Sequence, residues 1–117
     1  MKPISEMTTA ELNKAMAVDV MKWNVLHDKV FWDKENRISG LLGQRWNPAD
    51  NDNGYSNCYR AEEKMRELGL EEFYSEALGF LVEGAEWGGY ATYDLIHATC
   101  KQRCRAMLQT VREANDD

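Results

Sequence analysis

Apolar side chains recur every three or four positions from residue 8 to about residue 23, which is the spacing of one face of an α-helix. Thr8 and Glu11 stand at its start with the spacing of a capping box, in which a hydroxyl and a carboxylate each accept a hydrogen bond from a free backbone N–H. The expected buried stripe is Leu12, Ala15, Met16, Val20 and Trp23. The pattern therefore predicts a first helix over residues 8–23.

The pattern changes to short β-prone runs over residues 24–42. Val25–Leu26 and Val30–Trp32 are separated by polar residues, and Asp33–Asn36 has the composition of a turn before the apolar positions of Ile38–Leu42. β-Branched and aromatic runs bounded by turn residues are typical of strands. We therefore predict a β-hairpin in this region.

A polar loop is expected between Gly43 and Gly54. Pro48 disfavours a helical conformation for the residue before it, and the run of Asp and Asn that follows favours turns in which side chains accept hydrogen bonds from the backbone. A second helix comes next, and Gly69 is placed for a left-handed C-cap with Leu70 as its apolar contact. Its expected inward face is Tyr55, Cys58, Tyr59, Met65 and Leu68.

Residues 71–90 combine helix-forming Glu, Ala and Leu with a glycine at Gly79. Phe80–Val82 lies between glycines like a buried strand, so we predict a second strand pair here and then a glycine-rich loop through Trp87–Gly89. A last helix is expected after a cap at Thr92 or Asp94. Its expected stripe is Ile96, Cys100, Cys104 (or Arg103), Met107 and Val111, with Leu95 and Leu108 beside it. This order, α-ββ-α-ββ-α, predicts an α+β fold in which a small antiparallel sheet packs with about three helices.

The chain has 117 residues with 44% hydrophobic content, so we expect a single domain over residues 1–117, with frayed ends at 1–7 and 113–117. The formal net charge of −6 argues against non-specific nucleic-acid binding, which needs a basic face. No apolar run is long enough to span a membrane, and the first residues lack the pattern of a signal peptide. The odd number of 3 cysteines favours a reducing compartment, so a cytoplasmic location is expected.

The Asp- and Asn-rich run before the second helix invites comparison with a calcium-binding loop. An EF-hand loop needs Asp at its first position, Gly at its sixth and Glu at its twelfth. Placing Gly54 sixth puts Ala49 first and Arg60 twelfth. Placing Asp50 first puts Gly54 fifth and Ala61 twelfth. Neither alignment fits, so we interpret the run as a turn.

Three side chains of the last expected helix, His97, Cys100 and Cys104, fall on one helical side. Imidazole and thiolate groups bind zinc, and Cys58 offers a fourth ligand. The Cys-x-x-Cys pair common in structural zinc sites is missing from the sequence, and cysteine is among the most buried residue types. Core packing is therefore the favoured interpretation, with a metal site and redox pairing as the alternatives, and no cofactor is expected.

Recognisable catalytic motifs are missing from the sequence. Its 2 histidines, His27 and His97, do not lie in a motif that pairs a histidine with a cysteine nucleophile. Phosphate-binding loops, serine-nucleophile elbows and metalloprotease helices are not found either. The paired carboxylates fall on expected helix surfaces, so we expect a protein that is not an enzyme.

Aromatic residues are frequent, with 4 tryptophans and 5 tyrosines. Most are expected in the core, but Trp46, Trp87 and Tyr90 fall in expected loops, where aromatic side chains often anchor partners or ligands. We take these three and the neighbouring Asn47 as binding candidates. The arginine candidates for contact with a phosphate group are Arg45, Arg103 and Arg105.

Three stretches together resemble a known family: TTAELNKAMAVDVMKW, then WNP leading into YRAEEKMRELG, and finally CRAMLQTV. Their order is similar to that in the phage ABA-sandwich domain proteins, which are small α+β proteins of bacteriophages and prophages, mostly without assigned function. In that family the Trp-x-Pro corner is followed by Ser-Thr-Asp and then directly by the helix. Here Ala49–Asn51 stands in that place and a few extra residues precede the helix.

The resemblance implies a phage accessory protein, located in the cytoplasm of the bacterial host, that binds a host protein or protein complex, for example to inhibit a defence system. The alternative is a protein that binds and sequesters a small nucleotide signal, in a pocket that a homo-oligomer forms. An enzyme that joins a histidine to Cys58, Cys100 or a buried carboxylate is the third hypothesis.

Overall fold

The computed structural model describes residues 3–32, 37–83 and 98–115. The helical elements are η1 (Ile4–Glu6), α1 (Thr9–Ala15), η2 (Met16–Val20), α2 (Tyr55–Glu67), α3 (Glu71–Glu83) and α5 (Cys100–Asn115). The strands are β1 (Asn24–Leu26), β2 (Lys29–Phe31) and β3 (Ser39–Leu41). The predicted α+β class with a small antiparallel sheet is confirmed.

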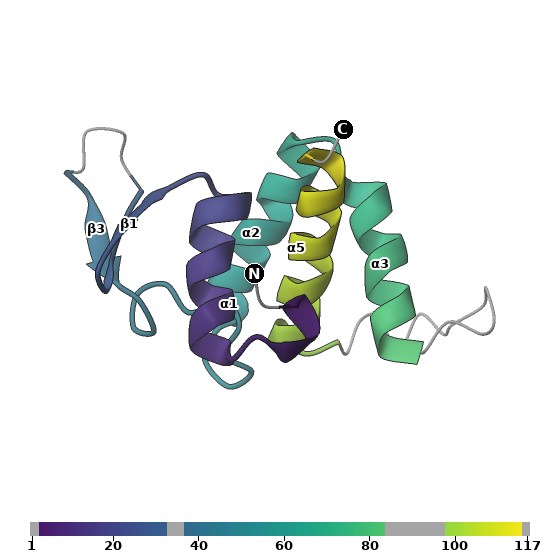
Figure 1. Ribbon diagram of the computed structural model, residues 1–117, viewed down its shortest axis with the longest axis horizontal. Coiled ribbons are helices and arrows are strands. Elements are labelled where there is room, and N and C mark those ends of the chain that lie inside the picture. The colour runs from purple at the N-terminus through teal and green to yellow at the C-terminus, as the bar shows by residue number, and fades with distance from the viewer. Residues whose placement is uncertain (1–2, 33–36, 84–97, 116–117) are drawn as a thin grey trace.

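Helix α5 occupies the centre of the fold, because it packs against α1, η2, α2 and α3. In Figure 1 it stands between α1 and α3, and the strands lie at the end of the molecule beyond α1. Its inward side supplies much of the core. The predicted members Cys100, Cys104, Met107, Leu108 and Val111 are all buried, and Leu95 and Ile96 lie outside the described residues.

The start of α5 is fixed by a capping box that differs from the predicted cap. Gln102 N–H donates to Thr99 Oγ1 at 3.1 Å, and Thr99 N–H donates to Gln102 Oε1 at 2.8 Å. The predicted caps, Thr92 and Asp94, lie outside the described residues. Residues 98 and 99 are not helical, so α5 begins later than a helix capped at residue 94 would.

The first helix agrees with its prediction. Thr8 N–H donates to Glu11 Oε1 at 2.9 Å, and Glu11 N–H donates to Thr8 Oγ1 at 3.2 Å, which completes the capping box. The helix widens into the π-helical segment η2, and Lys22 ends it in a left-handed conformation with φ of 61°. Leu12, Met16 and Val20 are fully buried along the predicted stripe.

The three strands form one antiparallel sheet in the order β1-β2-β3. Val25 pairs with Val30, and Val30 pairs with Gly40. His27, with φ of 55°, turns the chain between β1 and β2, which confirms the predicted hairpin. The turn predicted at 33–36 lies outside the described residues.

The second strand pair is a wrong prediction over residues 71–83, which form helix α3. Tyr74 and Leu78, one helical turn apart, are buried against the core, so the apolar spacing is helical and Gly79 is tolerated within it. The chain enters α3 through the predicted left-handed Gly69, whose N–H donates to Arg66 O at 3.0 Å. In the described part of the chain, the helices therefore pack mainly on one another and not on two sides of a sheet.

The inward face of α2 is narrower than predicted. Cys58 and Met65 are buried as expected, whereas Tyr55, Tyr59 and Leu68 are 40%, 52% and 42% exposed. The buried stripe follows the spacing Cys58, Ala61, Met65. Tyr55 and Tyr59 lie outside this stripe, at the surface of the molecule.

The chain ends carry more structure than their composition predicts. Ile4–Glu6 forms a 3-10 turn, Met7 is part of the buried core, and α5 continues to Asn115. The fraying expected at 1–7 and 113–117 concerns motion and stays a prediction. Among the described helices, none is both long and apolar enough to cross a membrane.

Candidate functional site

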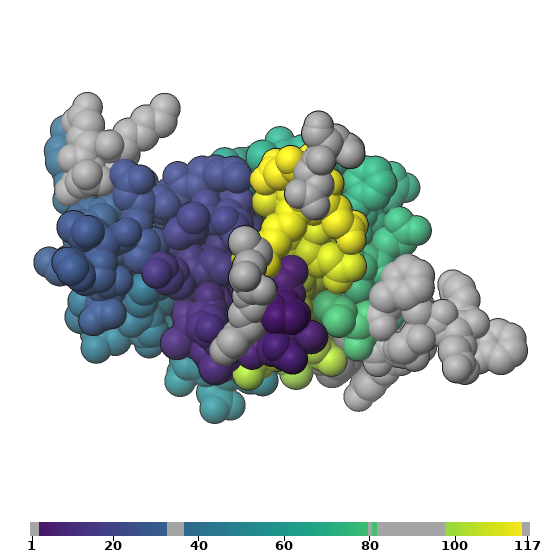
Figure 2. Space-filling model, in the orientation of Figure 1, coloured from purple at the N-terminus to yellow at the C-terminus, as the bar shows by residue number. Residues whose placement is uncertain are grey.

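A cleft of about 600 Å³ opens between the first turns of α1, the β1–β2 turn and the loop that follows β3. Figure 2 shows the blue hairpin and the teal segment after it beside the purple N-terminal helix. The charged residues that line this acidic cleft are Glu11, Lys14, Asp28 and Asp50, and His27 lies among them. Concave surfaces with several converging polar groups are the usual sites of ligand or partner binding.

The wall formed by the Trp46–Ala49 corner is held on α1 by one residue, Asn13. Trp46 Nε1 donates to the backbone oxygen of Asn13 at 2.9 Å, and the backbone N–H of Ala49 donates to Asn13 Oδ1 at 2.8 Å. Asn13 is 3% exposed, so both bonds are made away from water. Buried hydrogen bonds of this kind fix a single arrangement, since a buried group left unpaired is costly.

Asn47 joins the corner to α2. Its Oδ1 accepts a hydrogen bond from Asn57 Nδ2 at 2.8 Å, and Asn57 Nδ2 also donates to the backbone oxygen of Arg45 at 2.9 Å. Asn47 lines the acidic cleft as a binding candidate should, but it is 7% exposed and its amide is engaged within the protein. It therefore shapes the cleft wall.

Asp50 forms the predicted Asx turn. Its Oδ1 accepts hydrogen bonds from the backbone N–H groups of Asp52 at 2.9 Å and Asn53 at 3.2 Å. These two bonds hold the pKa of the Asp50 carboxyl below its usual range, because they favour the charged form. The interpretation of this run as turn chemistry is confirmed, and the carboxylate keeps its negative charge at the rim of the cleft.

The same loop also caps the first turn of α5. Asn51 Oδ1 accepts a hydrogen bond from the backbone N–H of Lys101 at 3.0 Å. The first turn of α5 is thus capped both by Thr99 and by a residue 50 positions earlier in the chain. The loop between β3 and α2 is therefore tied to α1, α2 and α5 at once.

Electrostatically, the cleft is acidic. Its lining carries the carboxylates Glu11, Asp28 and Asp50 against the single ammonium group of Lys14. One oxygen of Glu11 is shared with the capping box, and the backbone oxygen of Asp28 accepts from Leu42 N–H at 2.8 Å. A cleft of this charge attracts cationic groups and repels phosphate.

The predicted aromatic candidates do not form a surface among the described residues. Trp46 is 1% exposed, and its ring packs edge-on against Trp23 with centroids 4.8 Å apart. The prediction that Trp46 contacts something outside the fold is wrong, because its indole N–H finds its partner within the protein. Trp87 and Tyr90 lie outside the described residues.

The predicted arginine candidates are spread over different parts of the molecule. Arg103 pairs with Glu62 at 3.1 Å, with side chains 11% and 22% exposed, and so ties α5 to α2. Arg105 donates to the backbone oxygen of Met7 at 3.4 Å. Arg45 is exposed beside the sheet. Two of the three arginines therefore hold the fold together.

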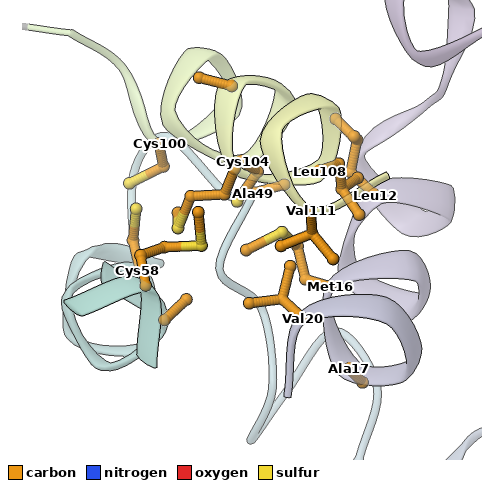
Figure 3. Close-up of a cluster of buried hydrophobic side chains, with 14 of the residues drawn as sticks. Leu12, Met16, Ala17, Val20, Ala49, Cys58, Cys100, Cys104, Leu108 and Val111 are labelled. Atoms are coloured by element: carbon orange, nitrogen blue, oxygen red, sulfur yellow. The ribbon is translucent and has the colours of Figure 1, made fainter. Parts of the chain in front are cut away.

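The three cysteines lie in the core between α2 and α5 (Figure 3). Burial and the neighbouring Cys58 raise the pKa of the Cys100 thiol to about 12. A hydrogen bond with Cys58 and burial also raise the pKa of Cys104. Raised pKa values disfavour the thiolate form, which is the form that acts as a nucleophile. Over the described ranges no three His, Cys, Asp or Glu side chains are placed to hold a metal ion, and His97 lies outside those ranges.

The residues that line the cleft come from segments far apart in the sequence. Glu11, Lys14, His27, Asp28 and Asp50 stand in no common motif, and sequence patterns could not bring them together. Of the residues that build this site, Asn13 is the one that the sequence could have indicated, because it is a polar residue beside Leu12 on the expected buried side of a helix.

Comparison of the chain with models of known protein families gives no match, and comparisons with curated proteins and with solved structures give none either.

Proposed function

We propose that this protein is a non-enzymatic bacteriophage accessory protein that binds a host protein or protein complex in the bacterial cytoplasm. Inhibition of a host defence or regulatory complex is the form of action that the resemblance to phage ABA-sandwich proteins implies. The observation that carries the proposal is the acidic cleft between α1, the β1–β2 turn and the loop after β3. Its lining suits a lysine or arginine side chain of a protein partner.

The construction of the cleft supports recognition. Polar side chains of its wall are already hydrogen-bonded within the protein, as Asn13 is to Ala49 and Asn47 is to Asn57. A preformed surface loses little conformational entropy when a partner binds. Its histidine, His27, lies in a cleft that the buried Cys58 and Cys100 do not line, so the histidine–cysteine site of the enzyme hypothesis finds no support here.

The nucleotide alternative finds little support in this cleft. A phosphate group would meet three carboxylates and one ammonium group, an arrangement that repels anions. Arg103, one of the arginines expected to contact phosphate, has the carboxylate of Glu62 as its partner. The charge of the cleft therefore favours a cationic segment of a protein over a nucleotide.

The test is a matched pair of charge reversals. Asp28→Lys changes an exposed aspartate that lines the cleft, and Asp52→Lys changes an exposed aspartate outside it. Tagged wild-type protein, expressed at near-native level in the bacterial host, is used to capture a partner, whose affinity for each variant is then measured. We expect Asp28→Lys to weaken binding at least about tenfold, and Asp52→Lys to change it less than about twofold.

Two results would refute the proposal. One is that wild-type protein captures no partner at near-native expression. The other is a captured partner whose affinity falls equally in the two variants, because that would indicate a response to net charge alone. For binding through the cleft, affinity also falls as salt is raised from about 0.05 to about 0.5 M, since salt screens exposed charges.

A further inference from the structure

A second cleft, of about 450 Å³, opens between the end of η2, the sheet and α2. It is lined by the aromatic residues Trp23, Phe31 and Trp32 together with the cationic residues Lys22 and Lys64. No Asp or Glu is among the described residues that line it. The described lining of this aromatic cleft is thus opposite in charge to that of the acidic cleft.

Two of its aromatic residues, Trp23 and Trp32, have their rings in contact. The centroids of Trp23 and Trp32 are 5.8 Å apart at an interplanar angle of 53°. Trp23 is wedged further by the buried Trp46 and by the guanidinium of Arg60, whose carbon lies 5.0 Å from the centre of the Trp23 ring. Trp23, Phe31 and Trp32 are all half-buried, so part of this aromatic surface is open to solvent.

Its two cations are available to a ligand. Lys22 is exposed and makes no ion pair with any described residue. Lys64 pairs with Glu67 at 3.7 Å, and the Glu67 side chain is 69% exposed, so water competes for this contact. Two ammonium groups beside aromatic rings match the chemistry of a flat base that carries phosphate.

Backbone conformation supplies an independent observation. Lys22 has φ of 61°, and the N–H of Trp23 donates to Ala17 O at 2.9 Å across it. Glycine is the usual residue at such a left-handed helix end, because a side chain there is strained. Residues held in strained conformations concentrate at functional sites. The strained Lys22 is one of the residues that line the aromatic cleft.

We propose that the aromatic cleft binds a nucleoside monophosphate, either free or as the end of a single-stranded nucleic acid. The base packs against the aromatic residues that line the cleft, and the phosphate meets Lys22 and Lys64. This site is separate from the acidic cleft, and neither proposal depends on the other.

Calorimetric titration of the full chain tests the site with adenosine monophosphate, adenosine and inorganic phosphate as probes. The nucleotide binds more tightly than either part, because it uses both the rings and the ammonium groups. Lys22→Gly removes one cation at a position where glycine is unstrained, so the fold is retained. We expect it to weaken nucleotide binding about tenfold. Phe31→Leu removes one ring and weakens the binding of both adenosine and the nucleotide.

The matched control is Lys29→Thr, which removes a positive charge at an exposed position of β2 outside the cleft. It should change the affinity less than about twofold. A single-stranded oligonucleotide with a 5′-phosphate shows whether the ligand is a free nucleotide or the end of a nucleic-acid strand. If the oligonucleotide binds more tightly than the mononucleotide, the ligand is a strand end. If it binds equally or more weakly, the ligand is the free nucleotide. Absence of mononucleotide binding at millimolar concentration overturns the proposal, as does equal weakening by Lys22→Gly and Lys29→Thr.

Discussion

The side chain of Asn13 on α1 accepts a hydrogen bond from the backbone N–H of Ala49 at 2.8 Å, although the two residues are 36 positions apart. The backbone oxygen of the same asparagine accepts from Trp46 Nε1. These two bonds dock the Trp-Asn-Pro corner on the first helix. They also fix part of the wall of the acidic cleft, because Asn13 and Asn47 both line it.

Asn13→Ala should destabilise the fold strongly, although alanine favours a helix more than asparagine does. The substitution leaves the buried N–H of Ala49 without its acceptor, which costs about 1–3 kcal/mol. We expect the free energy of unfolding in urea to fall by about 2 kcal/mol, and the thermal midpoint to fall by roughly 5–10 °C. The neighbouring Lys14→Ala is the control, since Lys14 is exposed and its loss changes stability by less than about 0.5 kcal/mol. Equal stability of the two variants would show that the bond to Ala49 contributes nothing.

Gly54→Ala tests the packing of the loop at its other end. A Cβ on Gly54 would lie 2.2 Å from the backbone oxygen of Asn47 and 2.6 Å from that of Asp50, so the backbone itself has to move. At Gly43, φ is 83° but nothing lies within 4 Å of an added Cβ. We therefore expect Gly43→Ala to cost about 1 kcal/mol of backbone strain, and Gly54→Ala to cost at least about twice as much. Urea denaturation measures both, and the reverse order would contradict the described loop.

The elements that the sequence predicted well are those specified by neighbouring residues. Thr8 and Glu11 lie one turn apart and cap a helix wherever it packs, and Gly69 ends α2 through its own backbone conformation. Local chemistry of this kind can be read from a short segment. The same is true of Asp50, whose carboxylate bonds to backbone groups two and three residues further on.

Residues 71–83 could not be assigned in this way. Glycine and a run of three apolar residues fit a buried strand as well as a buried helix, and only the packing of Tyr74 and Leu78 against the core decides between them. Trp46 is a similar case, since its partner Asn13 is 33 positions away. Both clefts are likewise assembled from distant segments, so their lining residues carry no motif that the sequence could have revealed.

The buried thiols should make the stability of the protein fall at alkaline pH. Burial and then the contact with Cys58 raise the pKa of Cys100 from 9.0 to about 12. The folded protein therefore keeps a proton that the unfolded chain loses, and the resulting stability is present below about pH 9 and lost as the pH rises toward about 12. Cys100→Ala removes this contribution. We expect the free energy of unfolding to fall less between pH 8 and pH 10.5 in Cys100→Ala than in the wild type.

Ser56→Ala on the exposed side of α2 is the control for that comparison, because it adds no titrating group and removes none. Its pH dependence should match the wild type. An identical decline in Cys100→Ala would place the alkaline loss of stability in other groups. Cys104 belongs to the same cluster and its pKa is also raised, so part of the decline should remain after Cys100 is replaced.

Lys22→Gly separates the proposed binding role of this lysine from its place in the fold. Lys22 and His27 are the non-glycine residues with positive φ in the described chain, at 61° and 55°. Glycine relieves the strain of that conformation but increases the entropy of the unfolded chain, and the balance is a gain of about 0.5–1 kcal/mol. We expect thermal denaturation to show both Lys22→Gly and His27→Gly to be more stable than the wild type. A stabilised Lys22→Gly protein that has lost affinity for the nucleotide would show that the strained lysine serves binding. A destabilised one would show instead that the lysine side chain supports the fold.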